Sequence, residues 1–165
     1  MTDWERQNEA RLEKEAAEQM PVPPGYPRET TLIAFEVRGQ SSFRYYIDGA
    51  SLSVQPKGIV RYVLLVRSPS GVDNVTYEAI RCPTAEYRVY ALGRNDGTWG
   101  GRAGTWSPIA ESRLLHHRVL QRDYFCPQSN AIADADEGRR ALRQGGNPRA
   151  TGFSGDDILR VPARE

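Results

Sequence analysis

Two cysteines and two histidines carry the most distinctive chemistry in this chain of 165 residues. Cys82 ends a predicted strand, and Cys126 ends a predicted helix 44 residues further on. If that helix packs on the strand, a disulfide between the two sulfurs contributes roughly 3–4 kcal/mol in the chain-entropy model. We favour this disulfide, which belongs to an oxidising compartment such as a periplasm or a cell surface. The alternative is two unrelated buried thiols in a cytosolic protein.

His116 and His117 precede Cys126, and nucleophilic catalysis pairs a thiol with a base of this kind. Both histidines lie on one predicted helix, and His116 falls in its apolar arc, so we favour a packed histidine. Zinc sites need three or four ligands at suitable spacing, which these histidines and two distant cysteines do not supply. The sequence therefore predicts no catalytic residue, no metal site and no cofactor. The alternative function is a cytosolic enzyme that uses Cys126 and a nearby histidine.

Two tryptophans and three strand residues make up a possible binding surface. Trp99 and Trp106 lie in a glycine-rich loop, and loops of this kind often bind a ligand. Arg61, Arg88 and Tyr90 lie on predicted strands, where arginine and tyrosine side chains can form a cationic stacking surface. The excess of basic residues in this part of the chain is modest, so a weak nucleic-acid-binding module is an alternative that we do not favour.

The hydrophobic pattern predicts a sheet that positions these residues. Apolar and polar residues alternate with the period of two that is typical of strands. The predicted strands cover residues 33–37, 43–47, 59–67, 75–82 and 87–91. Their connections are short, and a parallel crossover needs a dozen or more residues, so neighbouring strands must be antiparallel. We therefore predict a meander of five or six antiparallel strands.

One helix is expected to cover this sheet. Residues 112–123 have the composition and the length of a helix, and Pro108 suits a first helical turn. Leu115, Val119 and Leu120 fall within one arc of the helical wheel, which forms the apolar face of an amphipathic helix. The predicted fold class is therefore α+β, with an antiparallel meander sheet covered by one C-terminal helix.

Polar residues concentrate at both ends of the chain. Hydrophobic residues make up 39% of the sequence and charged residues 26%, a composition that leaves part of the chain outside any core. We predict a polar N-terminal helix over residues 1–20, a proline-rich linker over 21–30 and the α+β domain over 31–127. Residues 128–165 are predicted to form a polar, partly disordered C-terminal extension.

The charge and the hydropathy of the chain limit where the protein can act. The formal net charge is +1, and no apolar run reaches the roughly 18 residues that a membrane-spanning helix needs. The first residues are polar and charged, and they lack the features of an export signal. We therefore expect a periplasmic or cell-envelope protein if an export signal precedes this chain, and a cytoplasmic protein otherwise.

Five sequence runs stand out in collinear order over residues 26–127. They are FRYYIDGASLSV (43–54), IVRYVLLVRSPSG (59–71), YEAIRC (77–82), GRNDGTW (93–99) and DYFCP (123–127). Together these runs resemble the uncharacterised CNP-like family of betaproteobacteria. Members of that family look like exported envelope proteins. Because the family has no established activity, the resemblance implies no catalytic residue.

A sparser pattern consists of Tyr-Ile-Asp at 46–48, Ser51, the strand 77–82 and Cys126. It is faintly similar to surface adhesin protein E type domains. This resemblance implies an antiparallel sheet, a covering helix and the disulfide between Cys82 and Cys126. With the CNP-like resemblance, it predicts a non-enzymatic exported envelope or periplasmic domain that binds or assembles with an unknown protein or envelope ligand.

Overall fold

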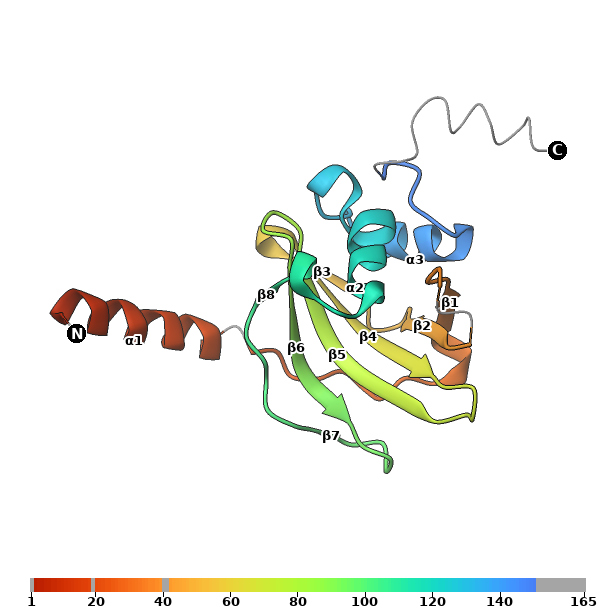
Figure 1. Cartoon of the computed structure of the whole chain (residues 1–165), viewed down its shortest axis with the longest axis horizontal. Helices are drawn as coiled ribbons and strands as arrows, with labels where there is room; N and C mark the ends of the chain where they lie inside the picture. The colour runs from red at the N-terminus through yellow and green to blue at the C-terminus, as the bar shows by residue number, and fades with distance from the viewer. Residues whose placement is uncertain (1, 19, 40–41, 151–165) are drawn as a thin grey trace.

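An antiparallel sheet lies at the centre of the molecule, as the computed structural model shows (Figure 1). The structure describes residues 2–18, 20–39 and 42–150. The strands are β1 (Leu32–Phe35), β2 (Arg44–Asp48), β3 (Ser53–Gln55), β4 (Ile59–Arg67), β5 (Asp73–Arg81), β6 (Glu86–Gly93), β7 (Trp99–Gly100) and β8 (Ser107–Pro108). Over the described residues their order is β1-β2-β4-β5-β6-β7, with β3 paired to β4 and β8 paired to β6. The predicted α+β class and antiparallel sheet are confirmed, and the structure adds the short strands β3, β7 and β8.

The long strands β4 and β5 form the middle of the sheet, and both of its faces are covered there. Side chains alternate between the two faces along a strand. Tyr62 of β4 accordingly lies in one hydrophobic cluster, and Val63 lies in the other. The sequence predicts a single covering helix, whereas an almost uninterrupted apolar run such as that of β4 indicates burial on both faces.

Helical segments that follow the last strand cover the first face, whereas the N-terminal helix projects away from the sheet (Figure 1). The helices are α1 (Asp3–Glu18), α2 (Leu115–Val119), the π-helix η4 (Leu120–Phe125) and α3 (Ala135–Gln144), with short 3₁₀ turns η1 (Glu29–Thr31), η2 (Pro56–Gly58), η3 (Ile109–Glu111) and η5 (Pro127–Ser129). η4 continues α2 directly, and its Leu120 and Phe125 are fully buried against the sheet. The helix predicted over 112–123 begins later, because the hydroxyl of Ser112 accepts the backbone N–H of Leu114 and forms a turn. None of the described helices has the length and apolar character that crossing a membrane requires.

The helix α3 packs into the same core although its sequence is mostly polar. Asp134 caps its N-terminus by accepting the backbone N–H of Glu137 at 2.8 Å. Leu142 is buried in the cluster of the first face. A Cβ on Gly138 would lie 2.7 Å from a methyl group of Leu52, so glycine is needed for this close approach. A narrow stripe of small and apolar residues is therefore enough to bury one side of α3.

The two polar ends of the chain relate differently to the domain. α1 agrees with the helix predicted over residues 1–20, and it begins with a capping box in which Thr2 and Glu5 each accept the other's backbone N–H. Residues 128–150, by contrast, are not the separate extension that we predict, because α3 contributes to the core. The domain boundary predicted at residue 127 is therefore too early. The predicted disorder concerns residues 151–165, which lie outside the described residues.

The second face of the sheet is covered by the N-terminal strap, residues 20–28, and by the loop between β7 and β8. Trp99 donates its indole N–H to the carbonyl of Pro24 at 2.9 Å. Tyr26 donates its hydroxyl hydrogen to the carbonyl of Arg94, directly after β6, at 3.2 Å. A Cβ on Gly93 would lie 2.4 Å from that hydroxyl oxygen. The proline-rich linker of the prediction is thus attached to the sheet.

A disulfide ties the helical cover to the middle of the sheet, as predicted. It joins Cys82, directly after β5, to Cys126, directly after η4, and the two Cα atoms lie 5.5 Å apart. Both cysteines are buried in the core of the first face. These are the only two cysteines in the sequence, so no thiol is free in this form of the protein.

Candidate functional site

Glu78 is a buried carboxylate in the middle of β5. Its side chain points to the helical face of the sheet, and only 3% of the residue is exposed. Oε1 accepts the hydroxyl hydrogen of Tyr62, its partner across the strand pair, at 2.8 Å. Oε2 accepts the hydroxyl hydrogen of Thr76 at 2.6 Å. Burial of a carboxylate is costly unless it is hydrogen-bonded in this way, so β4 and β5 are built to hold it.

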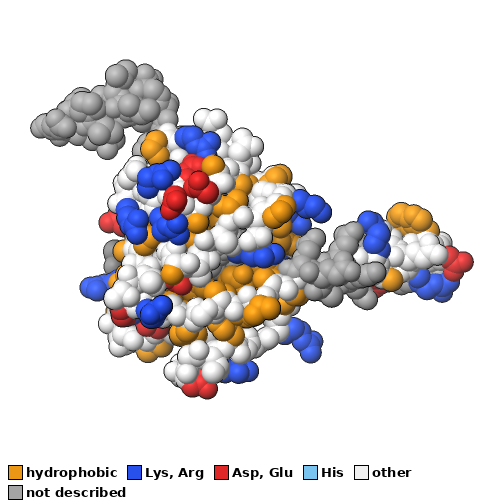
Figure 2. Space-filling view, turned by 180° about the vertical axis from the view of Figure 1, so that it is seen from behind, with side chains coloured by type: hydrophobic (Ala, Val, Ile, Leu, Met, Phe, Trp, Pro, Cys, Tyr) orange, Lys and Arg blue, Asp and Glu red, His pale blue; other side chains and the backbone are white. Residues whose placement is uncertain are grey.

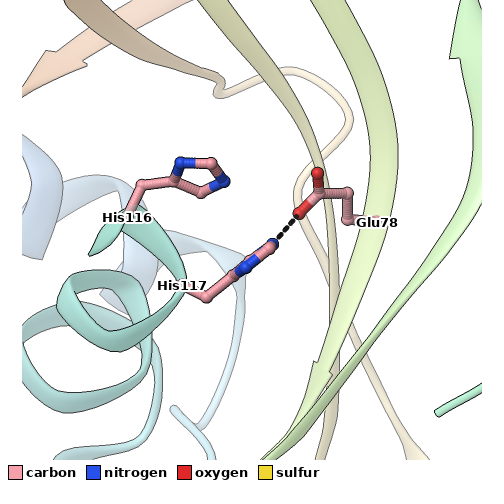
Figure 3. Close-up of side chains that lie close together, drawn as sticks. All are labelled: Glu78, His116 and His117. Atoms are coloured by element: carbon pink, nitrogen blue, oxygen red, sulfur yellow. Dashed lines mark hydrogen bonds and ion pairs between the residues drawn. The ribbon is translucent and has the colours of Figure 1, made fainter. Parts of the chain in front are cut away.

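His117 connects the helical cover to this carboxylate (Figure 3). It lies on the short helix α2, and its Nε2 donates to Oε1 of Glu78 at 3.0 Å, because a carboxylate can only accept. Nδ1 lies 2.8 Å from the hydroxyl oxygen of Ser112. The imidazole also stacks on the ring of Tyr87 of β6, with 3.9 Å between the ring centres. Contacts on both ring nitrogens and on the ring face therefore fix the orientation of His117.

His116 is equally buried but has a nitrogen without a partner. Only 5% of the residue is exposed, and its ring centre lies 4.4 Å from that of His117. Its Nε2 is buried and makes no hydrogen bond within the described part of the chain. Figure 3 shows this ring pointing from α2 toward Glu78. We call Glu78, His116 and His117 the histidine–glutamate cluster.

Burial and mutual contacts shift the protonation of the cluster. Burial alone raises the pKa of Glu78, but its contacts with His117, chiefly the hydrogen bond, outweigh burial and hold that pKa well below its usual value. Burial lowers the pKa of His116 to about 4, so this imidazole is neutral at pH 7. Burial and the nearby Glu78 raise the pKa of the Tyr62 hydroxyl well above its usual value, which keeps it a donor. At neutral pH the cluster thus offers the ionised carboxylate of Glu78 and the neutral imidazole of His116.

Acid is expected to destabilise the protein because His116 resists protonation. The unfolded chain takes up a proton at this imidazole near pH 6.5, whereas the folded protein does so only near pH 4. The free energy of unfolding therefore falls as the pH falls between these values, by on the order of 3 kcal/mol. Urea unfolding at pH 7 and pH 4 measures the loss, and His116→Phe should remove this part of it. An equal loss in the wild type and in His116→Phe would contradict the prediction.

A cavity of about 320 Å³ adjoins the cluster. Its wall is largely apolar and aromatic and is formed by Phe43, Tyr45, Leu64, Val66, Asn74, Thr76, Glu78, Leu114 and His116. Pockets of this size and character, with a few convergent polar groups, are typical of small-ligand sites. The cavity therefore gives a water molecule, an ion or a small ligand access to Glu78 and His116.

Two residues with nucleophilic side-chain types, Ser112 and Cys126, bear on the enzymatic alternative. Ser112, His117 and Glu78 form a chain of hydrogen bonds with the connectivity of a serine hydrolase triad. Ser112, however, is not among the described residues that line the cavity. Cys126 is held in the disulfide, so in this form it has no thiolate for the enzymatic alternative.

The cluster is also a possible metal centre, which the sequence does not predict. One donor atom each from Glu78, His116 and His117 lie within 4.8 Å of one another. We missed this convergence because Glu78 and His117 are 39 residues apart in sequence. A signal was present nevertheless: Glu78 lies four residues before Cys82 and shares its face of the strand. A disulfide from Cys82 to the helix therefore places Glu78 under that same helix.

The predicted binding surface lies on the opposite, second face of the sheet. The guanidinium carbons of Arg61 and Arg88 lie 5.7 and 5.5 Å from the ring centre of Tyr90. Trp99 and Trp106 pack on the hydrophobic cluster of this face, half-buried. The structure thus brings the five residues together, with both tryptophans packed on the sheet. Whether these residues bind a ligand stays a prediction.

Arg81 extends this surface. Its guanidinium carbon lies 4.3 Å from the ring centre of Trp106. The rear view in Figure 2 shows hydrophobic side chains gathered in a band with Lys and Arg side chains beside it. We call the whole set the aromatic–arginine face, which comprises Arg61, Arg81, Arg88, Tyr90, Trp99 and Trp106.

The fold and the site define a disulfide-linked α+β domain with a buried carboxylate–histidine cluster beneath its helical cover. A model of the CNP1-like family matches residues 11–143. The chain belongs to the CNP1-like family, and the predicted family is therefore confirmed. No curated protein and no solved structure matches the chain. The faint similarity to adhesin protein E type domains stays a prediction.

Proposed function

We propose that this member of the CNP1-like family is a non-enzymatic binding or assembly domain of the periplasm or the cell envelope. We infer the compartment from the disulfide between Cys82 and Cys126, which is buried in the core. Structural disulfides persist in oxidising compartments and are rare in the cytosol. In support, the disulfide links two elements that already pack together, as a structural cross-link does.

The aromatic–arginine face is the surface that we propose for binding. Arg61 holds its guanidinium group near the ring of Tyr90. Arg81, by contrast, uses its N–H groups within the domain, donating to Glu86 at 2.6 Å and to Thr84 at 2.9 Å. The Nε of Arg61 is buried and makes no hydrogen bond among the described residues. Arginine in such a setting recognises carboxylate and phosphate groups through paired N–H donors. The proposed partner is therefore an anionic envelope component or an acidic protein surface.

A thiol count tests the compartment. The protein is isolated from its native cells with a thiol-blocking reagent present, and its thiols are counted under denaturing, non-reducing conditions. We expect no free thiol before reduction and both cysteines after it, with the reduced sample as the positive control. Two free thiols in the native sample would place the protein in a reducing compartment and revive the cytosolic enzyme alternative.

Cross-linking in the source cells tests the binding surface. Carboxylate-directed cross-linking is compared between the wild type, Arg61→Gln and Arg118→Gln. Arg118 is a matched control, because it is an exposed arginine of α2 on the helical side. Loss of a charge-assisted contact weakens binding by on the order of tenfold or more, so we expect the adduct to fall in Arg61→Gln only. Equal adducts in all three proteins would contradict the proposed surface.

A further inference from the structure

Glu78, His116 and His117 form the set of side chains that the proposed function leaves unused. They come from the middle of β5 and from the start of α2, and Figure 3 shows them converging between the sheet and the helix. One carboxylate oxygen and one nitrogen of each histidine lie within 4.8 Å of one another. Two histidines and a glutamate are a donor set found in zinc sites that keep one coordination position open.

A second, independent observation points to a ligand at this place. His116 is 95% buried, since 5% of it is exposed, and its Nε2 makes no hydrogen bond within the described residues. Buried polar atoms are nearly always satisfied, and an unsatisfied one in a folded protein calls for an explanation such as an ion. A neutral imidazole with a free lone pair is the form in which histidine binds metals.

We propose that Glu78, His116 and His117 bind a divalent transition-metal ion, with Zn²⁺ as the first candidate. Carboxylate and imidazole donors suit zinc, and the chain offers no thiolate to compete while its two cysteines are joined. Donor atoms around a tetrahedral Zn²⁺ lie about 3.4 Å apart, as follows from bond lengths near 2.1 Å. Side-chain movements of about one ångström therefore bring the three donors to that spacing.

The contacts around the cluster already resemble an outer shell of a metal site. Tyr62 and Thr76 hold the carboxylate of Glu78 through their hydroxyl groups. Ser112 lies at hydrogen-bond distance from Nδ1 of His117. When an ion replaces the hydrogen bond from Nε2 to Glu78, the ring proton can therefore move to Nδ1 and leave Nε2 free for the ion. Metal-binding histidines are usually oriented by such a bond from their second nitrogen.

The cavity beside the cluster supplies the open side of the proposed site. Glu78 and His116 are among its lining residues, whereas much of the rest of the wall is apolar. A fourth ligand, either water or a small molecule with a donor atom, can reach the ion from this cavity. The cluster and the aromatic–arginine face lie on opposite faces of the sheet. The metal site can therefore fail a test without affecting the proposed binding function, and the reverse also holds.

Metal titration of the whole oxidised chain tests the proposal. Protein freed of metal with a chelator is titrated with Co²⁺, whose visible absorption reports its ligands, and then with Zn²⁺ as a competitor. We expect one equivalent to bind and both histidine ring signals in the NMR spectrum to shift. Removing a ligand with His116→Phe should weaken binding by more than about 100-fold, and removing an outer contact with Ser112→Ala by about 10-fold.

The variants also separate a metal ligand from a packing residue. His116→Phe is expected to fold, because the Nε2 that it removes makes no hydrogen bond among the described residues. Circular dichroism and the urea midpoint check this, and His116→Gln replaces it if the phenyl ring does not fit. Glu111→Gln, an exposed glutamate next to Ser112, is the matched control and should bind like the wild type. Wild-type affinity in both His116 variants, or no stoichiometric binding by the wild type, would overturn the proposal.

Discussion

The double variant Cys82→Ala/Cys126→Ala is expected to unfold with a free energy about 4 kcal/mol below that of the wild type. The disulfide spans 44 residues of sequence, and losing it frees a loop of that length in the unfolded chain. For a domain of this size the midpoint of thermal unfolding should fall by on the order of 10 °C. Calorimetry and urea unfolding under non-reducing conditions measure both quantities.

Reductant supplies the control for this prediction. The wild type with reductant should approach the stability of the double variant, and the double variant itself should not respond. If the wild type has the same urea midpoint with and without reductant, the disulfide does not stabilise the fold as we argue. Unfolding must be monitored by circular dichroism as well, so that loss of the helical cover alone is distinguished from global unfolding.

Glu78→Leu is expected to lower the free energy of unfolding by about 3–5 kcal/mol, because each buried donor left unsatisfied costs about 1–3 kcal/mol. The substitution leaves the hydroxyl groups of Tyr62 and Thr76 and the Nε2 of His117 without their shared acceptor. Urea unfolding at pH 7 measures the effect.

Two comparison variants define what this result would mean. Glu78→Gln keeps an acceptor oxygen and should cost less than Glu78→Leu. Glu86→Gln weakens the partly exposed pair of Glu86 with Arg81, so its cost should stay below about 1 kcal/mol. If Glu78→Leu falls within the range of Glu86→Gln, the carboxylate is not the buried centre of the hydrogen-bond network described above.

The strands were predictable because their signal is local. The alternation of apolar residues places β4 at residues 59–67, which are the observed bounds Ile59–Arg67. The short strands β3, β7 and β8 have two or three residues each, which is too few for a period of two to be recognised. Their pairing depends instead on the neighbouring strand and becomes visible only in the folded sheet.

The covering elements were harder to predict because their burial depends on distant partners. α3 reads as a polar helix, and only the position of Leu52 below Gly138 shows why it packs so closely. The position of the N-terminal strap also depends on a distant residue, because Tyr26 packs where Gly93 has no side chain. In the candidate site, the histidines and the disulfide could be recognised from the sequence, but their meeting with Glu78 required the helix to be placed on the sheet.

The positions of the three tryptophans allow their fluorescence to report on one face of the sheet. Trp4 is 71% exposed on α1, so its emission resembles that of indole in water in any state of the protein. Trp99 and Trp106 are half-buried on one face only, and the indole of Trp99 is bonded to the strap. Tryptophan fluorescence therefore reports on detachment of the strap and on occupancy of the aromatic–arginine face. The histidine–glutamate cluster lies on the other side of β5 and can be followed by the NMR signals of its two histidines. The two regions can therefore be followed separately in one sample.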